Sequence, residues 1–218
     1  MAYEDATLDE IRDALAPEVA ANAAFDGWTP RAVEAAASAL GIDADVARLA
    51  FPGGAVDMID AWFAHVDAEV RARLPDDRLA AMKIRERITT LVETRLEIVA
   101  PNREALRRAL AILALPQNVV RAAKLGWRSA DVMWRAAGDT ATDYNHYTKR
   151  MTLGAVYAAT IAVFLDDESE DFANTRAFLA RRIENIMQIE KAKAGMLGRG
   201  DRMPSLSRFI GRLRYPAV

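Results

Sequence analysis

The chain has 218 residues, of which 52% are hydrophobic and 28% are charged. This suits one sizeable folded domain and excludes wholesale disorder. It has no cysteine and only two histidines, which excludes disulfide frameworks, thiolate zinc sites, iron–sulfur clusters, cysteine nucleophiles and histidine-rich metal centres. The two halves carry opposite charge, because residues 1–80 have a net charge of −10 and residues 81–218 a net charge of +8.

Apolar residues recur at steps of three and four almost everywhere, and this spacing predicts an all-α protein. Thr7 begins the first helix and Asp26–Gly27 ends it, while Thr29–Pro30 begins the second and Gly41 ends that one. The nine predicted helices cover residues 8–26, 30–40, 44–50, 55–74, 76–100, 103–113, 116–138, 142–165 and 172–193.

The C-terminal segment is basic and has the pattern of a separate element. Glycines and a proline predict a flexible linker from residue 194, followed by a short amphipathic helix at 205–215. Its apolar stripe and neighbouring arginines, which are typical of a membrane-interface helix, are Leu206, Phe209, Ile210, Leu213, Arg208 and Arg212. The alternative is that this stripe packs on its own domain or on a neighbouring molecule.

The N-terminal segment and the longest apolar run are predicted to carry no targeting or membrane-spanning signal. Residues 1–18 hold six acids, one arginine and no apolar core, so neither a signal peptide nor a transit peptide is predicted there. Residues 151–165 form an uncharged run of fifteen, shorter than the roughly 20 residues that span a bilayer. This run predicts a buried helix.

Residues 8–74 resemble the helix-turn-helix front of the TetR regulators in the order and spacing of their helices and turns. The helix that would enter DNA, residues 43–50, carries two acids and one arginine within a lobe of strongly negative charge. Phosphate neutralisation supplies most non-specific affinity for DNA, so we expect no nucleic-acid binding. A ligand-responsive TetR-like regulator remains the alternative function.

The second half is similar to the Coq-nine family, the accessory proteins of ubiquinone biosynthesis with a TetR-like fold. The resemblance rests on the stretches at residues 130–150, 156–160, 165–169, 171–172 and 175–183. It implies a non-enzymatic protein that binds an isoprenoid quinone intermediate or phospholipid, docks on the demethoxyubiquinone hydroxylase and touches the membrane through a C-terminal amphipathic helix. The family's aromatic patch usually starts with Trp, whereas this chain has His146 there.

The resemblance implies two sets of site residues. The partner-binding set is Met133, Asp143, His146, Tyr147, Lys149 and Arg150. The lipid-binding set is Leu113, Trp134, Tyr157, Ile161 and Phe164. Aromatic and arginine side chains are common anchors of protein interfaces. The partner set could equally be a capped helix start with Tyr147 half-buried in the core, and both interpretations can hold together.

The segment 153–165 is apolar on every face, which predicts that it is enclosed. It contains Gly154 and several alanines. Such small residues either let another helix approach closely, as in helix packing and a dimer interface, or leave room for a long apolar ligand.

These inferences predict a TetR-like all-α bundle of about nine helices plus a C-terminal amphipathic helix. Its regions are a helix-turn-helix-like lobe without DNA binding (1–75), a lipid-binding and dimerisation region (76–193), and a linker with a membrane helix (194–218). No catalytic constellation, metal site or cofactor is predicted, since no Gly-x-Ser-x-Gly, phosphate loop or paired Glu-x-x-His occurs. We expect a homodimeric bacterial protein of the cytoplasm, peripheral at the inner membrane.

Overall fold

The computed structural model describes residue 3 and residues 5–142 and 144–200, with side chains through residue 188. Within these ranges every regular element is helical, which confirms the all-α prediction. The α-helices are α1 (Leu8–Asp26), α2 (Pro30–Leu40), α3 (Ala44–Leu49), α4 (Ala55–Arg73), α5 (Asp76–Ala80), α6 (Ile84–Val99), α7 (Arg103–Leu113), α8 (Val119–Ala136), α9 (Tyr144–Leu165) and α10 (Ala173–Gly200). Three short 3₁₀ turns are η1 (Ala100–Asn102), η2 (Pro116–Asn118) and η3 (Glu170–Phe172).

The first two helices begin and end where local signals in the sequence place them. Thr7 and Glu10 form a reciprocal capping box at the start of α1, which satisfies backbone N–H groups that have no partner in the helix. Pro30 is the first residue of α2, and Gly41 ends it with a positive φ of 68°. Glycine adopts this left-handed conformation without a side-chain penalty.

The predicted helix 76–100 is wrong as one element, because the chain breaks between α5 and α6. The side chain of Arg87 stabilises this break by donating from Nε to the carbonyl of Met82 at 2.9 Å and from Nη2 to the carbonyl of Ala80 at 3.0 Å. These carbonyls lie at the end of α5, where helical acceptors have no partner within the helix. A side chain from the next helix therefore replaces the missing backbone bonds.

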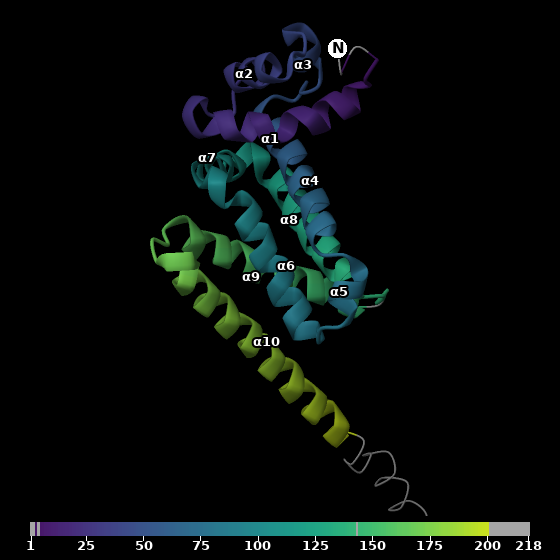
Figure 1. Cartoon of the computed structure of the whole chain (residues 1–218). Helices are drawn as coiled ribbons and strands as arrows, with labels where there is room; N and C mark the ends of the chain where they lie inside the picture. The colour runs from purple at the N-terminus through teal and green to yellow at the C-terminus, as the bar shows by residue number, and fades with distance from the viewer. Residues whose placement is uncertain (1–2, 4, 143, 201–218) are drawn as a thin grey trace, which may run out of the picture. The chain divides into compact units, whose positions relative to one another are not determined.

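The front of the chain packs tightly on the helices that follow it. Helix α1 lies against α2, α4 and α7, and α4 lies against α6 and α8 (Figure 1). Trp28 and Trp62 are buried with ring centroids 5.5 Å apart, and Trp28 Nε1 donates to the carbonyl of Ala105 at 3.0 Å. The structure thus places the predicted lobe 1–75 and the helices up to Leu179 in one compact unit.

A second unit begins at Ala180, inside α10. The structure continues this helix to Gly200, where the sequence predicts a linker from residue 194. Glycine in a helix interior costs only about 1 kcal/mol relative to alanine, which neighbouring helix-forming residues offset. The predicted membrane-binding residues, Leu206, Phe209, Ile210, Leu213, Arg208 and Arg212, lie outside the described residues. In the part that is described, no helix combines the length and apolar character needed to cross a bilayer.

Candidate functional site

The candidate site lies where α8 turns back into α9. The chain leaves α8 through Gly138, whose φ is 88°, and the N–H of Asp139 donates to the carbonyl of Trp134 at 2.9 Å. Arg87 Nη1 holds the turn by donating to the carbonyl of Ala137 at 2.8 Å. A Cβ at residue 138 would lie 3.1 Å from this nitrogen, so the turn requires glycine for both its conformation and its contact.

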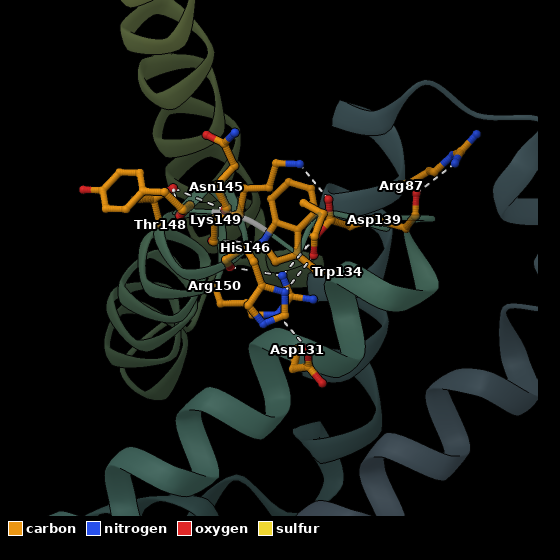
Figure 2. Close-up of polar contacts among 12 residues, drawn as sticks. Arg87, Asp131, Trp134, Asp139, Asn145, His146, Thr148, Lys149 and Arg150 are labelled. Atoms are coloured by element: carbon orange, nitrogen blue, oxygen red, sulfur yellow. Dashed lines mark hydrogen bonds and ion pairs between the residues drawn. The ribbon is translucent and has the colours of Figure 1, made fainter.

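Arg150 is the centre of the polar contacts below this turn. Its side chain is 2% exposed; Nε donates to Asp131 Oδ1 at 2.6 Å and Nη1 to Asp139 Oδ2 at 3.0 Å. Nη1 also donates to the carbonyl of His146 at 3.1 Å, within the first turns of α9 (Figure 2). One buried guanidinium therefore joins α8, the turn and α9.

Lys149 lies beside Arg150 and uses the same carboxylate. Its ammonium donates to Asp139 Oδ1 at 2.6 Å and lies 5.3 Å from the ring centroid of Trp134. The Trp134 indole N–H donates to the backbone carbonyl of Lys149 at 2.9 Å. The lysine thus contacts the indole face while the indole holds the lysine's own backbone (Figure 2).

The two carboxylates titrate below their ordinary range. Burial acts to raise the pKa of Asp131, but its hydrogen bonds and charge interactions with Arg150 and Arg135 outweigh burial and lower that pKa. Burial likewise opposes the lowered pKa of Asp139, where Lys149 and Arg150 prevail. Because both pKa values are lower in the folded chain than in the unfolded chain, ionised Asp131 and Asp139 stabilise the fold. This stabilisation is fully present above the unfolded pKa of about 4. It is lost as the pH falls through the lowered folded values.

Three aromatic rings from α8 and α9 lie in contact with one another close to these ion pairs. Trp127 of α8 lies 5.9 Å from Tyr147 and 6.1 Å from His146, measured between ring centroids, and His146 meets Tyr147 edge-on at 5.1 Å. His146 Nδ1 lies 3.0 Å from the carbonyl of Ala141. Because a carbonyl only accepts, Nδ1 is the donor in this contact. We call Trp127, His146, Tyr147 and Lys149 the aromatic surface.

The predicted partner residues divide between this surface and its support. Tyr147 is 57% exposed, while His146 and Lys149 are partly exposed. Met133 and Arg150 were predicted to contact a partner, but both are buried and have no face to offer one. The sequence did not indicate Trp127, since it lies twenty residues before Tyr147 and on a different helix. Asp143 lies outside the described residues.

The predicted lipid residues do not form a single cluster. Leu113, Ile161 and Phe164 are buried, and Phe164 packs on Phe172 with ring centroids 4.9 Å apart. Trp134 instead supports the aromatic surface through Lys149. Tyr157 is half-buried and belongs to a separate polar network.

That network centres on Arg95 of α6, which is 1% exposed. Its Nη1 pairs with the carboxylate of Asp67, its Nη2 donates to Ser129 Oγ at 3.1 Å, and its Nε donates to Tyr157 Oη at 3.2 Å. Burial acts to lower the pKa of Arg95, but the interactions with Tyr157 and Asp67 outweigh burial and raise that pKa. The arginine stays cationic and joins α4, α6, α8 and α9 in the core.

Within the single chain that the structure describes, segment 153–165 is not enclosed on every face. Ala155, Ala158, Ala159 and Ala162 lie on an exposed face of α9, because the packed neighbours of this helix lie on its other side. At Gly154, an added Cβ would lie 4.0 Å from both Ala130 Cβ and the carbonyl oxygen of Gly126. These are ordinary van der Waals distances, so α9 approaches α8 closely at this glycine and an alanine would still fit.

Helix α3, which would enter DNA, offers no free cation among its residues. Arg48 is the basic residue of α3, and it pairs with Asp45 at 2.6 Å and with Glu34 at 3.4 Å. Both partners cancel the charge that a phosphate would need. Elsewhere in the described part of the chain, no group of three or more acidic and histidine side chains is arranged to hold a metal ion.

Comparisons with known proteins agree with these features. Residues 119–190, which include α8, α9 and the aromatic surface, match the family described as COQ9. Ubiquinone biosynthesis protein COQ9, mitochondrial, of Rattus norvegicus is 34% identical over 169 residues, covering 75% of this chain and 54% of the rat protein. The Homo sapiens protein of the same name is 32% identical over 169 residues, covering 75% of this chain and 53% of its own length. The chain spans about half the length of the curated relatives it matches.

The fold has a match among solved structures. A crystal structure of the TetR transcriptional regulator from Nitrosomonas europaea ATCC 19718 superposes with a TM-score of 0.63 at 25% identity, covering 79% of this chain and 95% of that one. The predicted TetR-like fold and the predicted resemblance to the Coq-nine family are both confirmed.

Proposed function

We propose that this chain, a relative of the COQ9 proteins over three quarters of its length, is a non-enzymatic, lipid-binding accessory protein of ubiquinone biosynthesis. In this role it binds an isoprenoid quinone intermediate and presents it to the demethoxyubiquinone hydroxylase at the membrane. The observation that carries the proposal is the exposed aromatic surface, which is held in place by buried ion pairs within the matched residues 119–190.

The form of the aromatic surface supports a protein partner. Tyr147 is more than half exposed, yet its ring is braced by Trp127 and His146 instead of being free in solvent. Large aromatic side chains held in one orientation lose little entropy on binding and commonly dominate interface energies. Buried Arg150 fixes the backbone of α9 below them. The arrangement suits docking, and it contains no nucleophile paired with a base.

The remaining parts of the proposal rest on sequence pattern and exposure. The basic amphipathic segment after residue 200 favours a peripheral place on an anionic membrane, and the bacterial inner membrane is the location we propose. The exposed small residues of α9 suit a close helix contact with a second copy, which supports a homodimer. A transcriptional regulator is disfavoured by the paired charge of Arg48.

Retention of lipid tests the proposal. Protein purified without detergent is expected to carry an isoprenoid or phospholipid, measured by mass spectrometry of a solvent extract. Leu113, one of the predicted lipid-binding residues, is buried on α7, and on this proposal replacing it by Trp should lower the lipid occupancy. Ala111→Trp, on the exposed side of the same helix, is the control and should leave occupancy unchanged. Wild-type protein that neither retains lipid nor takes up added isoprenoid quinone would contradict lipid binding.

Partner docking predicts a specific effect of Tyr147→Ala. Binding to the hydroxylase should weaken by more than about 1 kcal/mol, or roughly fivefold. Thermal stability should stay nearly unchanged, because most of this ring is already exposed.

Titration calorimetry and thermal unfolding measure the two effects of this substitution separately. The matched control is Tyr144→Ala, which removes a tyrosine that is 79% exposed on the same helix. If stability falls and binding does not, Tyr147 is a core residue and the docking role is wrong.

A further inference from the structure

The corner between α7 and α8 carries large apolar side chains on its surface (Figure 1). Leu115, Val119 and Val120 are 44%, 53% and 69% exposed. They belong to a run of twelve residues, 109–120, that contains no charged side chain. Single apolar side chains are ordinary on a surface, but a group of them marks a contact with another molecule or with a membrane. We call Leu115, Val119 and Val120 the apolar corner.

Several polar groups at this corner are bonded within it. The side-chain amide of Asn118 and the backbone N–H of Leu115 both donate to the carbonyl of Ile112, at 2.8 and 3.2 Å. The N–H of Asn118 donates to the carbonyl of Leu115 at 2.8 Å, and Pro116 has no N–H to satisfy. Polar groups without a partner are costly to place in an apolar medium. These internal bonds lower the cost of moving the corner out of water.

The charge around the apolar corner is positive. Residues 105–130 contain five cations and no acid. Each of the four arginines in this stretch pairs with an acid outside it. Lys124 is exposed and has no ion-pair partner in the described part of the chain. It follows Val120 by one helical turn, so the two residues lie on the same face of α8. Exposed apolar side chains with a cation beside them suit the surface of an anionic membrane.

Size and charge argue against a protein as the occupant. Three side chains cover much less than the roughly 800 Å² that each partner of a stable complex buries. A two-fold contact with a second copy, centred on the apolar corner, would bring two Lys124 ammonium groups together, and their repulsion opposes it. A bilayer needs no complementary surface, and its anionic head groups attract the lysine.

We propose that the apolar corner inserts into the surface of an anionic membrane, with Lys124 at the level of the lipid head groups. This contact is separate from the basic segment after residue 200, and it rests on the proposed peripheral place at the membrane. Trp127 follows Val120 by two helical turns, about 10 Å along α8. Insertion of the corner therefore keeps the aromatic surface within reach of a partner that is itself bound to the membrane.

A spin label reports the insertion directly, because the chain has no cysteine and a single one can be introduced. Full-length protein carrying Val120→Cys is labelled and mixed with vesicles of phosphatidylcholine and phosphatidylglycerol in equal parts. The label should become more accessible to oxygen and less accessible to a water-soluble nickel chelate, since oxygen concentrates in hydrocarbon and the chelate stays in water. Leu49→Cys, at a residue of α3 that is 65% exposed, is the control, and its label should remain in water.

Substitutions separate the apolar contribution from the electrostatic one. Val119→Ser combined with Val120→Ser should lower the vesicle partition coefficient about tenfold in both low and high salt. Lys124→Gln should lower it about fivefold in low salt, and this difference should disappear in high salt because the attraction is screened. Leu49→Ser is the control and should partition as the wild type does. Thermal unfolding should be nearly unchanged in all these variants, since every substituted side chain is exposed.

The outcomes distinguish this inference from the membrane role on which it rests. Vesicles that bind the full chain while the label at residue 120 stays in water overturn insertion of the corner and leave the peripheral location intact. A full chain that does not bind the vesicles overturns both. A label that loses access to the chelate when the protein is concentrated without vesicles shows a second copy on the corner, which also overturns the inference.

Discussion

Replacing Asp67 with alanine is expected to lower the free energy of unfolding by about 3–5 kcal/mol, because it leaves the Arg95 cation buried without its counterion. Arg95 is 1% exposed and bonded on all three nitrogens, so it has no route to solvent without opening the contacts among α6, α8 and α9. For a chain of this length the melting temperature should fall by about 6–20 °C. Chemical denaturation and calorimetry measure the two quantities.

A double variant shows whether the loss comes from the unpaired charge. Asp67→Leu combined with Arg95→Met removes both charges and keeps apolar volume, so much of the stability should return. Asp60→Ala is a useful comparison, since this carboxylate also pairs with an arginine, Arg128, but is partly exposed. Asp60→Ala should lower the free energy of unfolding by less than about 1 kcal/mol. An Asp67→Ala variant as stable as the wild type would show that the network does not hold the core.

Arg150→Met is expected to lower the free energy of unfolding by about 2–3 kcal/mol. This is less than the cost of breaking a buried ion pair whose members have no other partner. The loss is smaller because Asp139 keeps Lys149 and Asp131 keeps Arg135. The same change should weaken partner binding more than Tyr147→Ala does, since Arg150 holds the His146 carbonyl and with it the whole aromatic surface. Arg135→Met is the control. It removes a mostly exposed partner of Asp131 and should cost about 0.5 kcal/mol.

The cost of Arg150→Met should depend on pH in one direction. The pKa of Asp131 and of Asp139 is lowered in the folded wild type, with Arg150 among the causes. The stabilisation by these carboxylates is present above their unfolded pKa of about 4 and is lost as the pH falls below it. The stability difference between the two proteins should therefore be largest near neutral pH and shrink towards pH 3. A difference that is constant with pH would show that Arg150 acts by packing alone.

Most helix boundaries were predictable because they are set locally. Thr29–Pro30 and Gly41 fix both ends of α2 within a few residues of chain. The break before α6 was not predictable, since residues 81–83 contain neither glycine nor proline and the turn is held by Arg87 from the following helix. The exposed face of α9 was not predictable either. Its apolar sequence indicates burial on all sides, whereas the structure leaves its alanines exposed.

The site was predictable only in part, for a related reason. His146, Tyr147, Lys149 and Arg150 lie within five residues of one another, and so their grouping needed no tertiary structure. Which of them faces outward depends on Asp131 and Asp139, whose spacing from Arg150 gives no helical signal. The Arg95 network is harder still. Asp67, Arg95 and Ser129 each look like a surface residue of an ordinary helix, and only the fold brings them together.

The pairing of Lys149 and Arg150 with Asp139 and Asp131 has a consequence for how fast a partner arrives. In the folded chain the field of these two cations is largely cancelled by their carboxylate partners within a few ångströms. Long-range steering speeds encounter only when such a field extends beyond the screening length, about 8–10 Å in ordinary salt. Association through the aromatic surface should thus proceed at the unsteered rate, about 10⁵–10⁶ M⁻¹s⁻¹, and change little with ionic strength. Selectivity would then reside in how long the complex lasts.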